Sequence, residues 1–70
     1  MCLYFKKGNK YRFKAALSLE NNLNRSERTL KELDGLDVTL ETDSELCYLG
    51  TCITKTGYSW TVFPIECEEI

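Results

Sequence analysis

Three apolar stretches dominate the second half of the chain, between Leu36 and Ile70, and only short polar segments separate them. Their sequences are LDVTL, ELCYLGTCIT and GYSWTVF. Apolar and polar residues alternate in the first and third stretches, and this two-residue period is typical of a strand with one solvated face. We therefore predict that this half of the chain forms an antiparallel sheet, with each stretch as one strand.

The length and composition indicate one small globular domain that spans residues 1–70. A chain of this length buries only about 60% of the surface that it exposes when unfolded, so its core must be small. Hydrophobic residues make up 43% and charged residues 29% of the sequence, as in ordinary soluble proteins. We find neither an apolar run of membrane-spanning length nor a secretory signal at the start. We therefore expect a cytoplasmic protein that does not bind a membrane.

Charge is distributed unevenly along the chain, although the net charge is only −2. Residues 1–31 contain eight Lys or Arg and two Glu, a balance of +6. Residues 32–70 contain one Lys and nine acidic residues, a balance of −8. The sequence therefore suggests a dipolar surface, unless the fold interleaves the two halves.

A half-buried strand is predicted between residues 10 and 18, where basic and apolar residues alternate. In this interpretation Tyr11 and Phe13 face the core. The outer row carries the basic side chains of the strand, which are Lys10, Arg12 and Lys14. This row is the main positive feature of the sequence.

One short helix is predicted after this strand and a polar loop over residues 20–24. Asn24 or Ser26 can cap its first turn, and Asp34-Gly35 ends it. Two leucines three residues apart give the helix an apolar edge, which allows it to pack against the sheet.

Glycine and proline mark the predicted turns in the second half of the chain. Gly50 interrupts the second apolar stretch and suggests a bulge or bend of the kind with which small barrels turn a corner. Lys55-Thr56-Gly57 is typical of a hairpin turn. Pro64 ends the last long strand, and we expect one tight turn after it, followed by a short closing strand over Glu68–Ile70.

The order of these elements resembles that of small SH3-like β-barrels. The resemblance lies in the opening FKKGNKYRF, the Leu-Asp-Gly before a strand, and the closing YSWTVFP with its short acidic tail. The positions that carry it are Phe5, Gly8, Gly35, Val38 and Trp60. The chain is similar in this respect to the stand-alone SH3-like proteins that bacteriophages and prophages encode. It departs from them in having Asn9 where an aspartate is usual, and in a helix added to the first loop.

The resemblance implies a mainly β fold, namely a five-stranded antiparallel SH3-like barrel with one short helix in the first long loop. It also implies a phage accessory protein that acts in the bacterial cytoplasm. Such a protein would attach to a host or viral protein and modulate or inhibit it.

The residue types in the chain do not suggest catalysis or a cofactor. Histidine is absent, so a cysteine nucleophile would lack its usual base. Zinc sites usually contain two close pairs of ligands, which the spacing of Cys2, Cys47, Cys52 and Cys67 does not provide. A bulge at Gly50 could still bring Cys47 and Cys52 onto one face, so a metal or redox role for that pair stays open. We expect free structural thiols, no metal and no enzymatic activity.

Basic side chains are the first group of candidates for binding. Lys10, Arg12 and Lys14, together with Arg25 and Arg28, could grip the phosphates of a nucleic acid. The aromatic residues between them are expected in the core, which leaves the charge without surfaces on which bases could stack. A net acidic chain is also repelled by phosphates at long range.

Aromatic side chains are the second group. Tyr48 and Tyr58 could recognise a peptide or a protein, whereas Trp60 is expected at the centre of the core.

Acidic side chains are the third group. Asp37, Glu41 and Asp43 could form a negative face that docks on a basic site of another protein, or they could serve solubility alone. Glu66 and Glu68 are expected on a solvated face. We thus predict binding of a host or viral protein, with nucleic-acid binding as the alternative and a structural subunit of a virion or larger complex as a third possibility. The oligomeric state stays open.

Overall fold

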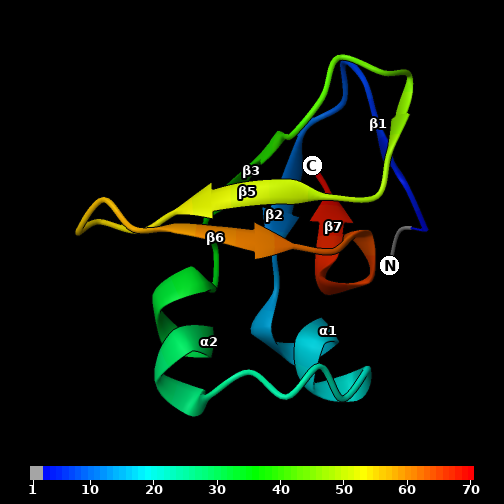
Figure 1. Ribbon diagram of the computed structural model, residues 1–70. Helices are drawn as coiled ribbons and strands as arrows, with labels where there is room; N and C mark the ends of the chain where they lie inside the picture. The colour runs from blue at the N-terminus through cyan, green and yellow to red at the C-terminus, as the bar shows by residue number, and fades with distance from the viewer. Residues whose placement is uncertain (1–2) are drawn as a thin grey trace.

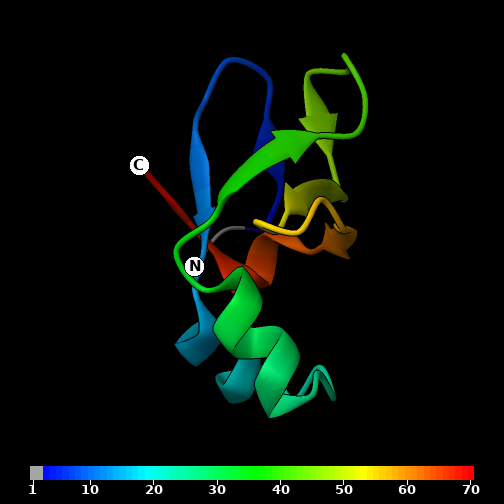
Figure 2. The ribbon, with the colours of Figure 1, turned by 90° about the vertical axis from the view of Figure 1, so that its left-hand side faces the viewer.

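The computed structural model describes residues 3–70, with the strands at one end of the molecule and both α-helices at the other (Figures 1 and 2). In chain order the elements are β1 Phe5–Lys6, β2 Tyr11–Phe13, α1 Ala15–Glu20, α2 Glu27–Leu33, β3 Asp37–Leu40, β4 Leu46–Cys47, β5 Gly50–Ile53, β6 Ser59–Val62, the 3-10 helix η1 Pro64–Glu66, and β7 Cys67–Glu69. The fold is therefore mainly β, as predicted.

Five strands form an antiparallel sheet in the order β6-β5-β3-β2-β7, and β1 pairs with β4 in a separate two-stranded ribbon. The prediction of a closed barrel is wrong for residues 3–70, because β6 and β7 remain as two separate edges of the sheet. The reason is that the stretch ELCYLGTCIT does not form one long strand. It divides at Tyr48 and Leu49 into β4 and β5, and β4 pairs with the ribbon instead of extending the sheet.

The predicted strand over residues 10–18 is also shorter than expected, because it ends at Phe13 and the chain enters α1 at Ala15. The segment AALSLE of α1 is rich in good helix formers. The Asp34 carboxylate accepts a hydrogen bond of 3.0 Å from the Ala15 amide and so satisfies one free donor at the start of the helix. Residues 3–70 therefore contain two α-helices where the sequence predicted one.

The predicted helix corresponds to α2, and its limits agree with the local signals. The Ser26 side chain caps it by accepting a hydrogen bond of 3.2 Å from the Thr29 amide, so the alternative cap at Asn24 is wrong. The helix ends before Asp34. Leu30 and Leu33 are buried against the sheet, as their spacing predicted.

The hydrophobic core lies between the sheet, the ribbon and α2. Its buried members are Phe5, Tyr11, Phe13, Leu30, Leu33, Cys47, Cys52, Val62 and Cys67. Trp60 is not at the centre of this core, as the sequence suggested, but is partly buried at its edge. Because Trp60 lies on the edge strand β6, it has a neighbouring strand on one side only.

The predicted turns at Lys55-Thr56-Gly57 and after Pro64 are present, whereas the register of β5 runs through Gly50 without a bulge. Gly57, with φ of +89°, lies in the turn between β5 and β6, where glycine tolerates the left-handed conformation. Gly50 begins β5 and is buried. A Cβ at Gly50 would clash with Val38 and lie 3.0 Å from the Phe5 ring, so this glycine allows close packing between the sheet and the ribbon.

Candidate functional site

The ribbon of β1 and β4 has one buried and one exposed face. Phe5 pairs with Cys47, and both side chains are buried. Because side chains alternate along a strand, the adjacent residues face outward. The outward residues of the ribbon are Tyr4, Lys6, Leu46 and Tyr48.

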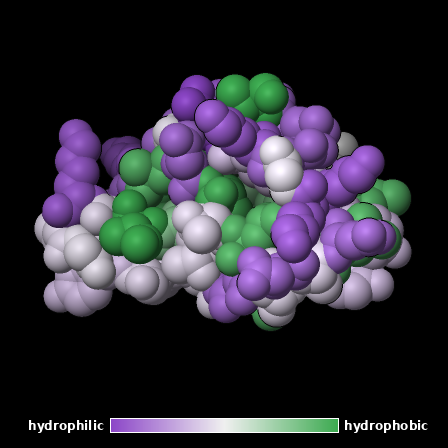
Figure 3. Space-filling model, turned by 90° about the horizontal axis from the view of Figure 1, so that it is seen from above, coloured by the Kyte–Doolittle hydropathy of each residue, from purple (hydrophilic) through white to green (hydrophobic). Residues whose placement is uncertain are grey.

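Large apolar side chains gather on this exposed face and beside it. Tyr4 is 43% exposed, Leu46 57% and Tyr48 66%. Leu3 and Leu49, at the ends of the ribbon, are exposed as well. We call these five residues the ribbon patch. Seen from above, the surface shows hydrophobic side chains in several separate areas among hydrophilic ones (Figure 3). Hydrophobic residues therefore do not cover this side of the molecule continuously.

The two tyrosines of the ribbon patch contact each other. Their ring centroids are 5.0 Å apart and the planes meet at 64°, which is an edge-to-face arrangement. A hydrogen bond with Tyr4 raises the pKa of Tyr48 above its ordinary value of 10.0. Tyr48 is therefore held in place by a neighbour although two thirds of its surface is exposed, which reduces the entropy lost on binding.

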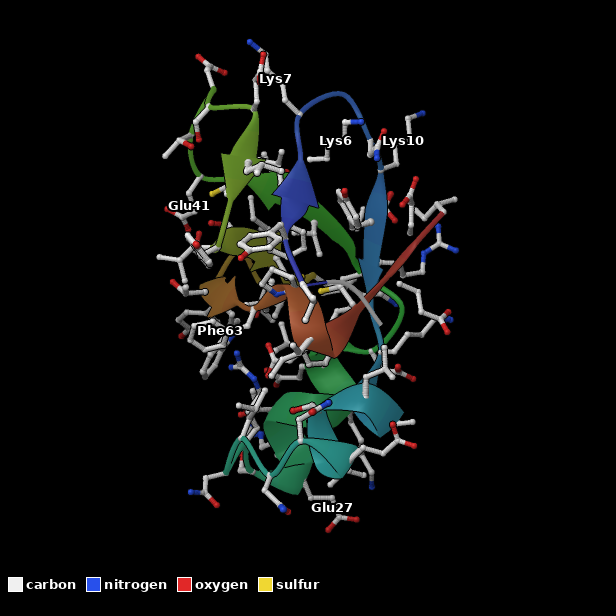
Figure 4. All side chains as sticks on the ribbon, turned by 90° about the vertical axis from the view of Figure 1, so that its right-hand side faces the viewer. Lys6, Lys7, Lys10, Glu27, Glu41 and Phe63 are labelled. Carbon is white, nitrogen blue, oxygen red and sulfur yellow. The ribbon has the colours of Figure 1, made fainter. Side chains whose placement is uncertain are left out.

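Lysines flank the ribbon patch. Lys6 and Lys7 line a shallow hollow together with Glu45 and Leu46. Lys10 lies near both lysines around the turn that joins β1 to β2 (Figure 4). Within residues 3–70, none of these three lysines forms an ion pair. Of the basic row that the sequence predicted along β2, Lys10 therefore lies at this end of the molecule, where Lys6 and Lys7 add two further positive charges.

The rest of the predicted basic row is neutralised by neighbouring strands. Because β2 lies between the acidic strands β3 and β7, Arg12 lies opposite both Asp37 and Glu68. Arg12 forms an ion pair of 3.1 Å with Asp37, and Lys14 lies 4.0 Å from Glu68. The fold therefore interleaves the two oppositely charged halves, and the hypothesis of a dipolar surface is wrong in this region.

Arg25 is not available for phosphate binding, because it forms a buried ion pair with Glu66. Its Nε donates to Glu66 Oε1 at 2.6 Å, and its Nη2 donates to Glu66 Oε2 at 2.9 Å. The Glu66 side chain is fully buried and the Arg25 side chain is 13% exposed. The expectation that Glu66 lies on a solvated face is wrong, because it also accepts bonds from Ser18 and from the Phe63 amide.

This ion pair covers part of the free edge of β6. Arg25 Nη2 donates to the Thr61 carbonyl at 2.7 Å, and Glu66 Oε2 accepts from the Phe63 amide at 3.0 Å. A neighbouring strand would supply one donor and one acceptor in the same way. Arg25 and Glu66 thus provide the hydrogen-bond partners that a further strand would give to the Thr61 carbonyl and the Phe63 amide.

The other charged candidates do not form a common site. Arg28 lies 3.8 Å from Glu32 on α2, and both side chains are exposed. Glu27, at the start of the same helix, lies at the opposite end of the molecule from Lys10 (Figure 4). Asp37 is paired with Arg12. Glu41 accepts a hydrogen bond from Thr51. Asp43 is exposed in the loop before β4, so the predicted negative face of Asp37, Glu41 and Asp43 is divided by these contacts.

The two predicted recognition tyrosines are both exposed but lie at different sites. Tyr58 is 67% exposed and precedes β6 at the hairpin, whereas Tyr48 belongs to the ribbon patch. Sequence reasoning missed Tyr4 and Leu46. The available signal was two short apolar runs, Leu3-Tyr4-Phe5 and Leu46-Cys47-Tyr48, because a strand that buries Phe5 or Cys47 turns the directly adjacent residues outward.

Cys47 and Cys52 are free and buried. Cys67 is buried as well, and Cys2 lies outside the described residues. Burial raises the pKa of the Cys52 thiol to about 11. Two opposing effects act on the pKa of the Cys47 thiol: burial raises it, whereas hydrogen bonds with Leu49, Thr42 and Glu41 lower it. The hydrogen bonds together outweigh burial, so the pKa lies below the ordinary value of 9.0. Across residues 3–70, no three His, Cys, Asp or Glu side chains form a group that could hold a metal ion.

Comparisons with known protein families, with curated protein sequences and with solved structures each find no match to this chain. In the described part of the chain, no helix has the length and apolar character that crossing a membrane requires. The geometry of the surface is therefore the basis for assigning a function.

Proposed function

We propose that this chain is a non-enzymatic protein-binding module that attaches to its partner through the ribbon patch. The observation that supports this function is the exposed Tyr4–Tyr48 pair beside Leu46, on a ribbon whose opposite face is anchored in the core. Tyrosine contributes a large contact area with little entropy loss and is common at interface hot spots. Exposed apolar clusters of this kind mark interaction sites on soluble proteins.

The flanking charges specify the chemistry of the partner. Lys6 and Lys7 at the border of the patch favour a surface with an apolar centre and acidic residues around it. In keeping with the resemblance to phage-encoded proteins, we propose that the partner is a host or viral protein that this chain modulates.

We also propose that the fold is an opened relative of the SH3-like barrel. Two features support this assignment. The single-turn helix η1 directly precedes the last strand, and that strand, β7, pairs with β2.

Site-specific crosslinking tests the ribbon patch. A photo-reactive amino acid at position 48 should capture the partner from a bacterial lysate, whereas the same group at Leu19 of α1 should not. With the purified partner, calorimetry should show that Tyr48→Ala weakens binding at least tenfold, as for a hot spot of about 1.4 kcal/mol or more. Leu46→Ala and Leu19→Ala form a matched pair, because these leucines are 57% and 65% exposed. Equal affinity of the two leucine variants would contradict the proposal.

Binding of single-stranded nucleic acid is the second candidate, because Lys6 lies on the same outward face of the ribbon as the exposed rings of Tyr4 and Tyr48, and Lys7 follows it. Such a surface could hold phosphates and stack bases. Fluorescence anisotropy with labelled single strands at low salt measures this activity. Binding that salt abolishes, and that the double variant Lys6→Glu, Lys7→Glu removes, would favour nucleic acid over protein.

A further inference from the structure

The sheet has two free edges of very different character. At one edge β7 carries two adjacent acidic residues, Glu68 and Glu69, both exposed. At the other edge β6 has the sequence SWTV and contains no charged residue. Charged side chains on an edge strand prevent pairing with another sheet, and β6 lacks this protection.

The register of the hairpin shows which backbone groups of β6 face outward. The Thr54 amide donates to the Tyr58 carbonyl at 3.0 Å, so this pair is hydrogen-bonded across the hairpin. Hydrogen-bonded and non-bonded pairs alternate in an antiparallel ladder. Trp60 is therefore bonded to β5, whereas the backbone groups of Ser59 and Thr61 point away from β5.

Part of this outward row is already occupied. The Thr61 carbonyl accepts from Arg25, and the next outward amide, that of Phe63, donates to Glu66. Within residues 3–70, the outward groups of β6 that remain without a hydrogen bond are the amide and carbonyl of Ser59 and the amide of Thr61. Both residues are exposed, so another strand can approach them.

We propose that β6 pairs antiparallel with β6 of a second copy of this chain, about a two-fold axis at Ser59. In this register the Ser59 amide of each copy donates to the Ser59 carbonyl of the other. The Thr61 amide of each copy donates to the Gly57 carbonyl of the other. The ladder ends there, because the Thr61 carbonyl is held by Arg25 and the Gly57 amide donates to the Thr54 carbonyl. The free amide and carbonyl of Ser59 thus match the two groups that a two-fold axis at this residue requires.

The side chains support a second copy as the occupant. No like charges meet when β6 faces β6, whereas pairing of β7 with itself would place glutamates opposite each other. The same register brings Tyr58 next to Trp60 of the second copy, at a non-hydrogen-bonded position where side chains are closest. An aromatic pair at such a position stabilises a sheet. This pairing would cover Tyr58, which is 67% exposed in one copy.

The inference is independent of the proposed function, because the ribbon patch does not belong to this edge. Sedimentation velocity over about a hundred-fold concentration range should show a monomer that converts to a dimer by mass action. The fluorescence of Trp60, the single tryptophan, should change over the same range. Leu46→Ala, in the ribbon patch, should leave the equilibrium unchanged.

Variants of Ser59 test the register. Ser59→Pro removes the outward amide but no bond to β5, so the dimer should be lost while circular dichroism shows a folded chain. Ser59→Ala is the matched control and should dimerise as the wild type does, because only backbone groups bond. Ser59→Lys and Ser59→Glu should each weaken the dimer about fivefold, because like charges lie opposite at the axis. An equimolar mixture of these two variants should dimerise more strongly than either variant alone, because opposite charges then face each other at the axis.

Two outcomes would overturn the proposal. A wild-type chain that stays monomeric over the whole range excludes the dimer. A dimer that survives Ser59→Pro, or a mixture of Ser59→Lys and Ser59→Glu that dimerises no better than either variant alone, excludes pairing about Ser59.

Discussion

The buried ion pair between Arg25 and Glu66 predicts a large and specific loss of stability. In Arg25→Ala the Glu66 carboxylate keeps two of its four hydrogen bonds, those from Ser18 and from the Phe63 amide. Its negative charge is then fully buried with no cation beside it. Removing one partner of a buried pair costs about 3–5 kcal/mol.

This cost is about half or more of the whole stability of a chain of this size. At about 0.05–0.15 kcal/mol per residue, a 70-residue domain has a free energy of unfolding of about 4–10 kcal/mol. Because the slope of unfolding in urea is about 1 kcal/mol/M for a small protein, the midpoint should fall by about 3 M or more. Arg25→Lys keeps the charge but not the forked geometry, so its midpoint should fall by less.

Urea denaturation followed by the fluorescence of Trp60 measures these effects. Arg28→Ala is the matched control, because it also removes an arginine from an ion pair. The side chains of Arg28 and Glu32 are 91% and 40% exposed and lie 3.8 Å apart. The free energy of unfolding should therefore fall by less than about 0.5 kcal/mol. If Arg25→Ala costs no more than Arg28→Ala, the interpretation of Glu66 as a charge that depends on Arg25 is wrong.

Three further predictions concern the core. Gly50→Ala should destabilise the fold by about 1–3 kcal/mol in urea denaturation, because the added methyl group clashes with Val38; an unchanged midpoint would contradict this packing. The pKa of Cys52 is raised from 9.0 to about 11, so the unfolded chain loses this proton first, and wild-type stability should fall by about 2 kcal/mol relative to Cys52→Val as pH rises from 9.0 to about 11. Parallel pH profiles of these two proteins would refute that reasoning. Cys47, whose pKa is lowered, should react with iodoacetamide before Cys52 in peptide mapping by mass spectrometry, and equal rates would show that its environment does not activate it.

The parts of the fold that local signals determine could be predicted from the sequence. The hairpin of β5 and β6 follows from apolar strands around the turn at Gly57. The limits of α2 follow from Ser26 and Asp34. The turn at Pro64 and the short strand after it follow from the restrictions of proline.

The features that depend on distant residues could not be predicted in this way. The ribbon forms because Phe5 pairs with Cys47, and nothing in the sequence near either residue indicates that the two pair with each other. Because that pairing diverts β4 from the sheet, the expected closed barrel does not form. Helix α1 was not predicted, because its alternating apolar residues also fit a strand. In addition, the side chain that accepts a hydrogen bond from its first residue, Ala15, belongs to Asp34, 19 residues away.

The candidate site was predicted only in part for the same reason. Tyr48 was identified, but the residues beside it depend on the ribbon. Arg25 was chosen for its charge, although the network that buries it lies 41 residues further along the chain at Glu66.

The position of β2 in the middle of the sheet has a consequence for how the protein is made. One of its neighbours, β7, is built from residues 67–69, which leave the ribosome long after β2 itself. Until then the flank of β2 that β7 covers lacks its hydrogen-bond partners. The sheet can therefore be completed only after β7 has been synthesised, and during this interval the incomplete sheet is exposed to chaperones and proteases.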